Sequence, residues 1–170
     1  MILFKRYIIS SCLFFLAINL PAQNITGTWE GDLENDQFIR LNIIQTGSQI
    51  CGYTYDHVKA DQRSFCKAFF EGYYDKQLRK LFISGKYFLE NSGGHFLMNM
   101  ALAYKKSKGD EILEMKPTAA SVLSSVLSNF GIEIEADPFE EGTNVGFVRL
   151  KKVSDQPYEL TALMKDCIAR

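Results

Sequence analysis

The sequence has few of the residues on which catalytic and metal-binding sites are usually built. Its 170 residues include two histidines, His57 and His95, and four cysteines, with neither a C-x-x-C nor an H-x-x-x-H spacing. It has no G-x-S-x-G segment of the kind that carries an activated serine, and no glycine-rich loop that would hold phosphates. The sequence therefore predicts neither an enzyme nor a bound cofactor or metal ion.

The nearest approach to a metal-binding set is Asp56 and His57 taken with Cys51 or Cys66. Because Asp56 to Ser64 has the composition of a polar loop, we interpret His57 as a solvated loop residue instead. The acidic residues between Glu133 and Glu141 lack the order of a calcium-binding loop and are interpreted as a surface loop.

A strong excess of charge of one sign is also missing. The chain has 19 Lys and Arg against 20 Asp and Glu, and these charges are scattered along its length. Nucleic-acid binding normally requires a cationic surface, so we expect no nucleic-acid partner.

Long apolar runs are absent except near the start, at residues 8–18. Lys5 and Arg6 precede this run, and Ala22 follows it before a polar residue. A basic start, an apolar middle and a small residue are typical of a secretory signal peptide, and the run is shorter than the roughly 20 apolar residues of a membrane span. We therefore predict a signal peptide at residues 1–22, cleavage after Ala22, no transmembrane segment in the mature protein, and export to the periplasm or the outside.

Residues 23–170 then suit a single domain that retains three cysteines, Cys51, Cys66 and Cys167. An exported protein meets an oxidising compartment, so a disulfide is expected, and an odd count leaves one thiol free. We favour Cys51–Cys66, because these two flank the loop at 56–64 on neighbouring strands. The alternative, Cys66–Cys167, would join the tail to the body of the protein.

Most of the domain alternates apolar and polar residues at the period of a β-strand. Phe96, Met98, Met100, Leu102 and Tyr104, for example, share one face of a single segment. Short turns separate the strands, which favours an antiparallel sandwich or barrel. The expected strands are residues 37–46, 49–55, 65–74, 77–90, 95–104, 111–115 and 146–153.

Two segments depart from this alternation. Residues 117–131 place apolar side chains at helical spacing, and residues 157–170 could form a second, short helix. The first helix must bury its apolar side, either along the wall of the sheet or as a cap over one end.

Gly27-Thr28-Trp29, which contains the only tryptophan, stands at the start of the first expected strand. A Gly-x-Trp at this place in a small exported β protein resembles the lipocalin and wider calycin pattern, over about residues 25–153. The resemblance implies an all-β, up-and-down, lipocalin-like barrel with one helix before the last strand. It also implies that Gly27 and Trp29 close one end of the barrel and that a basic side chain packs across the indole. Arg149 is the matching candidate, with Lys151 next.

Small closed barrels have room for one ligand in the lumen or the mouth. The expected function is therefore binding of a small apolar molecule. Its candidate contacts combine rings with a few polar groups: Tyr53, Tyr55, Tyr73, Asn99 and Tyr104. The alternative is a protein-interaction or inhibitor module, in which the barrel is filled and a protein partner binds outside.

Overall fold

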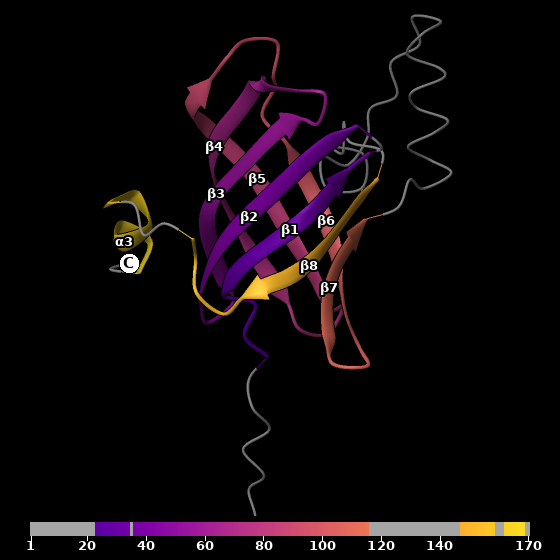
Figure 1. Ribbon diagram of the computed structural model, residues 1–170. Helices are drawn as coiled ribbons and strands as arrows, with labels where there is room; N and C mark the ends of the chain where they lie inside the picture. Colours follow the sequence, from indigo (N-terminus) through magenta and orange to yellow (C-terminus); the bar gives the residue numbers. More distant parts are fainter. Residues whose placement is uncertain (1–22, 35, 116–146, 159–161, 169–170) are drawn as a thin grey trace, which may run out of the picture.

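Eight antiparallel strands form a closed barrel, in which each strand pairs with the next along the chain and the last pairs with the first (Figure 1). The computed structural model describes residues 23–34, 36–115, 147–158 and 162–168. The strands are β1 (Gly27–Leu33), β2 (Gln37–Thr46), β3 (Gln49–Val58), β4 (Asp61–Asp75), β5 (Lys80–Asn91), β6 (Asn99–Ser107), β7 (Asp110–Met115) and β8 (Val148–Ser154). The expected all-β, up-and-down barrel is confirmed.

The apolar side chains predicted to share a face of β6 fill the barrel interior. Met98, Met100, Leu102 and Tyr104 are all buried in the main core, whereas Phe96, just before the strand, is 59% exposed. Alternate residues of the other strands complete the same core, because side chains of a strand point to its two faces in turn. Most of the barrel interior is therefore occupied by side chains.

The polar loop expected at residues 56–64 is largely strand. β3 continues to Val58 and β4 begins at Asp61, and Asp56 pairs with Cys66 in the antiparallel register. β3 and β4 stay paired by backbone hydrogen bonds almost to the turn, and this pairing keeps the polar residues of the segment in strands. His57, interpreted from the sequence as a loop residue, therefore lies in β3, where its ring stacks on Phe38 with centroids 5.1 Å apart.

Trp29 lies fully buried at the end of the barrel where the chain enters β1. Its Nε1 donates a hydrogen bond to the carbonyl oxygen of Ile25 at 2.9 Å, and its ring meets Tyr104 edge-on. Gly27 has a φ of 138°, and a Cβ there would collide with the backbone oxygen of Ser154. The Gly-x-Trp spacing thus places a residue without a side chain against β8 and a large ring inside the barrel.

The basic residue beside Trp29 is Lys152, not Arg149. Arg149 is exposed on the outer face of β8, because Val148 and Leu150 on either side of it point into the core. Lys152 falls on the inward face, and its Nζ lies 5.7 Å from the centre of the Trp29 ring. The prediction that Arg149 packs across Trp29 was wrong, because successive residues of a strand face opposite sides and Arg149 is on the outer side.

The disulfide joins Cys51 to Cys167 and leaves Cys66 as a buried free thiol. The favoured Cys51–Cys66 pair was wrong because the two residues face opposite ways: Cys51 belongs to a cluster on the outer wall, and Cys66 points inward. The alternative, Cys66–Cys167, was wrong for the same reason.

The outer cluster lies under a short C-terminal helix, α3 (Ala162–Ile168), which sits outside the barrel beside β3 (Figure 1). Met164 of this helix is fully buried against Ile44, Tyr53 and Phe69. The chain before α3 is also anchored, because the backbone N–H of Tyr158 donates to the Asn42 side chain at 2.7 Å. The short C-terminal helix expected from the sequence is confirmed.

The helix expected at residues 117–131 lies outside the described residues. Within the described part of the chain, no helix has the length and apolar character needed to cross a membrane.

Candidate functional site at the barrel mouth

A cavity of about 280 Å³ lies where β1 and β3 end, and Trp29 is near the other end of β1. The strand ends and turns of this rim enclose it with a mixture of apolar and polar groups: Leu33, Glu34, Gln37, Asp56, Val58, Ser64, Gly93, Gly94, His95, Phe96 and Met98. A pocket of this size, close to the lower limit of ordinary ligand sites, suits a small ligand.

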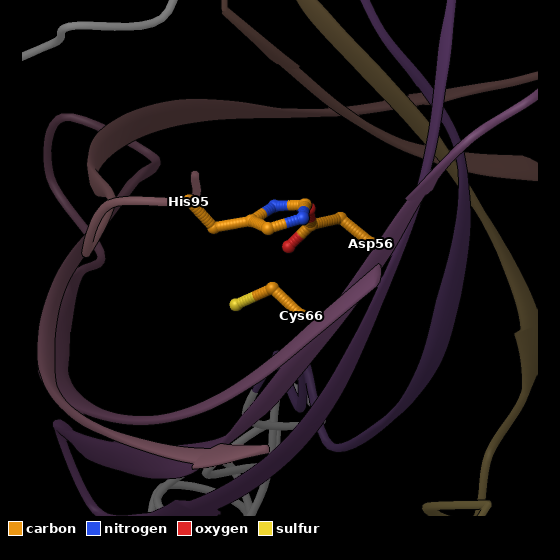
Figure 2. Close-up of side chains that lie close together, drawn as sticks. All are labelled: Asp56, Cys66 and His95. Carbon is orange, nitrogen blue, oxygen red and sulfur yellow. The ribbon is translucent and has the colours of Figure 1, made fainter. Parts of the chain in front are cut away.

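The side chains of Asp56, Cys66 and His95, each of which has an atom able to bind a metal ion, lie close together beside this cavity (Figure 2). Asp56 and Cys66 are directly opposite each other on β3 and β4, and both point into the barrel. His95 approaches from the segment between β5 and β6. One donor atom of each residue lies within 4.8 Å of the others.

The turn before His95 is attached to the same strand that carries Cys66. The backbone N–H of Phe65 donates to Ser92 Oγ at 2.9 Å, and the N–H of Ser92 donates to the carbonyl of Phe65 at 3.0 Å. Gly93 and Gly94 then adopt φ angles of 105° and 75°, which residues with a side chain rarely adopt. This turn fixes the position of His95 relative to Cys66.

Asp56 and His95 form a buried pair. His95 Nδ1 lies 3.2 Å from Asp56 Oδ2, and the two side chains are 12% and 5% exposed, respectively. Burial raises the pKa of Asp56 above its usual value, and the neighbouring His95 opposes this shift. The pair is therefore held in an environment that disfavours an uncompensated negative charge.

The hydrogen-bonding capacity of this pair is only partly used by the described residues. Asp56 Oδ1 and His95 Nε2 are both buried, and neither has a hydrogen-bond partner within the described part of the chain. A buried polar atom without a partner costs about 1–3 kcal/mol. Both residues line the mouth cavity, so these atoms lie within its wall.

Cys66 contributes a thiol rather than a thiolate to this group. Burial, together with the nearby Asp56 carboxylate, raises the pKa of the Cys66 thiol to about 12. A reactive cysteine needs the opposite shift, since the thiolate is the nucleophile. Without a metal ion, the three residues therefore lack the thiolate of a nucleophilic cysteine triad. An ion that displaces the thiol proton could still be held by their sulfur, nitrogen and oxygen donors.

The residues predicted to bind a ligand do not come together in one site. Tyr104 is buried beside Trp29, and Tyr53 is buried in the outer cluster. Tyr55 borders a shallow outer pocket, and Tyr73 is 38% exposed, with its ring stacked on Phe82. Asn99 is half-buried at the start of β6 and does not line the mouth cavity. Tyr53 and Tyr55 border the same outer pocket, whereas Tyr104 faces the interior, so the five residues lie on both sides of the barrel wall and do not form one site.

From the sequence, Asp56 and His57 were considered with Cys51 or Cys66 as a metal-binding set and rejected, and His95 was not considered with them. The alternation of β3 contained the missing signal, since His57 must face outward if Asp56 faces inward. The approach of His95 had no local signal, because the closure of the barrel brings it to the other two residues.

A second, larger cavity, of about 630 Å³, lies on the outer wall of the barrel next to α3. Ile44, Phe69 and Tyr87 supply its apolar lining, and Glu71 and Lys86 border it. None of the buried polar atoms that lack a partner among the described residues belongs to this lining. Its lining therefore combines apolar side chains with the polar and charged groups of Gln49, Glu71 and Lys86, and differs from the mouth cavity in lacking a buried polar atom without a partner among the described residues.

Comparison with known proteins gives the chain no family: no family model matches it, and neither a curated protein sequence nor a solved structure matches it.

Proposed function

We propose that this protein is an exported, lipocalin-like barrel that binds a small molecule in its mouth cavity. The observation that carries the proposal is the mouth cavity itself, whose lining includes Asp56 and His95, two residues that each have a buried side-chain atom (Oδ1 and Nε2) without a partner among the described residues. Ligand sites commonly combine an apolar lining with a few polar groups that fix the orientation.

The lining suggests the chemistry of the ligand. Leu33, Val58 and Met98 offer apolar contacts, and Asp56 and His95 offer an acceptor and an imidazole on the same wall. We infer a small ligand with an apolar part and one polar head group. A ligand deep in the lumen is not favoured, because the side chains of Trp29, Tyr104 and their neighbours occupy that region.

Two observations support export. The first 22 residues have the composition of a signal peptide, and Cys51 and Cys167 form a disulfide. Disulfides persist mainly in oxidising compartments. Fractionation of the native host, with sequencing of the mature N-terminus, tests this part of the proposal: we expect a chain that begins at Gln23 outside the cytoplasm.

Native mass spectrometry of protein purified from its own host tests the binding site. We expect a small additional mass on the wild-type protein and its loss in Ser64→Phe, because Ser64 lines the mouth cavity and a ring there would fill it. Ser107→Phe is the matched control, because Ser107 is an exposed serine at the last position of β6 and does not line the mouth cavity. A wild-type protein without an additional mass, or a mass that Ser64→Phe retains, would contradict the proposal.

A protein-interaction module is the second candidate, and the outer wall of β4 and β5 favours it. Tyr87 is 43% exposed there and stacks on Phe69 at the edge of the outer cavity. The same native spectra separate the two functions. A protein-sized partner that Tyr87→Ser removes and Ser64→Phe retains would favour the interaction module.

A further inference from the structure

We propose that Asp56, Cys66 and His95 bind a divalent transition-metal ion of the zinc class at the inner wall of the mouth cavity. The inference rests on the proposed binding function of that cavity, because the ion would offer its open coordination position to the ligand. The three side chains come from β3, β4 and the segment before β6, and Figure 2 shows the Asp56 carboxylate beside the His95 ring, with Cys66 next to them.

The distances suit a three-residue site. One donor atom of each side chain lies within 4.8 Å of the others, and His95 Nδ1 and Asp56 Oδ2 are 3.2 Å apart. Ligands of a tetrahedral zinc ion are about 3.3–3.8 Å apart, given zinc–ligand bonds of about 2.0–2.3 Å. A small rotation of the side chains would therefore bring all three donors into contact with one ion. As the bond between the ion and Cys66 Sγ forms, the S–H bond breaks and its proton passes to the solvent, so binding releases one proton.

The donor set selects the class of metal. A sulfur, an imidazole nitrogen and a carboxylate oxygen are ligands that zinc accepts together, whereas calcium and magnesium require oxygen ligands. Three protein ligands leave a fourth position of a tetrahedral ion open, as in zinc sites that bind water or a substrate. Asp56 and His95 line the cavity, so the open position would face it.

Burial and unused polar atoms provide a second observation, independent of the spacing. Asp56 is 3% exposed, and its Oδ1 has no hydrogen-bond partner among the described residues, nor has His95 Nε2. A buried carboxylate with an unpartnered oxygen is costly, and a cation bound to it offsets that cost. The 3.2 Å approach to Asp56 is made by His95 Nδ1, so the ion would leave Nε2 without a partner. His57, the other histidine, faces the outer side of β3 against Phe38 and Tyr55 and supplies no donor atom to this cluster.

The anchored turn favours a site that exists before the metal arrives. Two hydrogen bonds join Ser92 to Phe65, next to Cys66, so the turn that carries His95 is attached to the strand that carries the sulfur. Asp56 and Cys66 are held by the β3–β4 ladder. Ion binding then requires movement of side chains and little rearrangement of the backbone.

Titration of the metal-free, disulfide-intact protein with Co²⁺, followed by competition with Zn²⁺, tests the proposal. We expect the absorption of tetrahedral cobalt together with a thiolate-to-cobalt charge-transfer band. Cys66→Ser should abolish the charge-transfer band, and His95→Ala and Asp56→Asn should each weaken binding by more than about 100-fold, beyond the loss typical of outer-shell substitutions. His57→Ala and Asp61→Asn are the matched controls and should bind Co²⁺ as the wild type does.

X-ray absorption of the zinc-loaded wild type needs no variant, so it remains decisive if a substitution prevents folding. We expect one sulfur neighbour at about 2.3 Å together with lighter nitrogen and oxygen neighbours. The absence of stoichiometric binding, the absence of a sulfur neighbour, or undiminished binding by His95→Ala would each overturn the metal site.

The metal site and the proposed ligand site fail in distinguishable ways. The cobalt titration uses the ion alone, whereas native mass spectrometry measures the organic molecule and its response to Ser64→Phe. An organic mass without metal binding would overturn this inference and retain the proposed function. Metal binding without an organic mass would retain the metal site and overturn the proposed ligand-binding function.

Discussion

Lys152 lies directly opposite Trp29 in the pairing of β1 with β8, with its Nζ 5.7 Å from the centre of the indole ring. The ammonium group is also bound to Asp155 at 2.7 Å, and the Lys152 side chain is only 11% exposed. The last strand of the barrel thus places a cation against the single tryptophan. Acidic groups around the end of the barrel keep that cation in position.

Replacing Lys152 should alter both the stability of the protein and the emission of Trp29. We expect Lys152→Ala to lower the free energy of unfolding by about 0.5–2 kcal/mol, the range of a partly desolvated cation–π contact. The tryptophan emission spectrum should shift, because the nearest charge is removed. Arg149→Ala is the control on the outer face of the same strand, and it should leave the emission unchanged. An identical spectrum in Lys152→Ala would contradict the assignment.

The disulfide should contribute more to stability than any single surface contact. Cys51 and Cys167 are 116 residues apart in sequence, and cross-links that close long loops stabilise proteins by about 2–5 kcal/mol. We expect Cys167→Ser to lower the free energy of unfolding by that amount, as measured in denaturant, and to expose the outer cluster beneath Met164. Cys66→Ser should leave the disulfide intact in a non-reducing peptide map. A map that joined Cys66 to either of the other cysteines would refute the pairing.

The Cys66 thiol should make stability fall at alkaline pH in the metal-free protein. Its pKa is raised from 9.0 to about 12 in the folded state, so the folded protein holds this proton more tightly than the unfolded chain. The resulting stabilisation is fully present below pH 9 and is lost as the pH rises toward about 12.

The measurement is the difference in free energy of unfolding between the wild type and Cys66→Ala, followed from pH 8 upward. We expect the wild type to lose stability relative to the variant over this interval. Native Cys66 should also resist alkylation at pH 8 and react after unfolding. A difference independent of pH, or rapid alkylation of the native thiol, would show that Cys66 is not buried as described.

Local sequence patterns determined the class of fold. Met98, Met100, Leu102 and Tyr104 alternate with smaller or more polar residues, and the structure turns all four into the core. Short turns between such segments favour antiparallel pairing of neighbours, because two adjacent strands need little chain to meet. The all-β, up-and-down arrangement follows from these two local features.

The same alternation also indicates which residues face the interior of the barrel and which face outward. Val148 and Leu150 are apolar, so Arg149 between them had to face outward and Lys152 inward. Asp56 and Cys66 face inward on β3 and β4, whereas Cys51 faces outward, which excludes a Cys51–Cys66 bond. Strand parity thus separates the inner and outer residues once the strand boundaries are known.

Only the tertiary structure decided which distant residues meet. His95 reaches Asp56 and Cys66 because the turn after β5 folds over the rim of the closed barrel, and Cys167 reaches Cys51 because α3 returns along the outer wall. Both contacts depend on the curvature and closure of the sheet, which no short segment encodes. The sequence by itself determined the strands and their faces; the closure of the barrel determined the site.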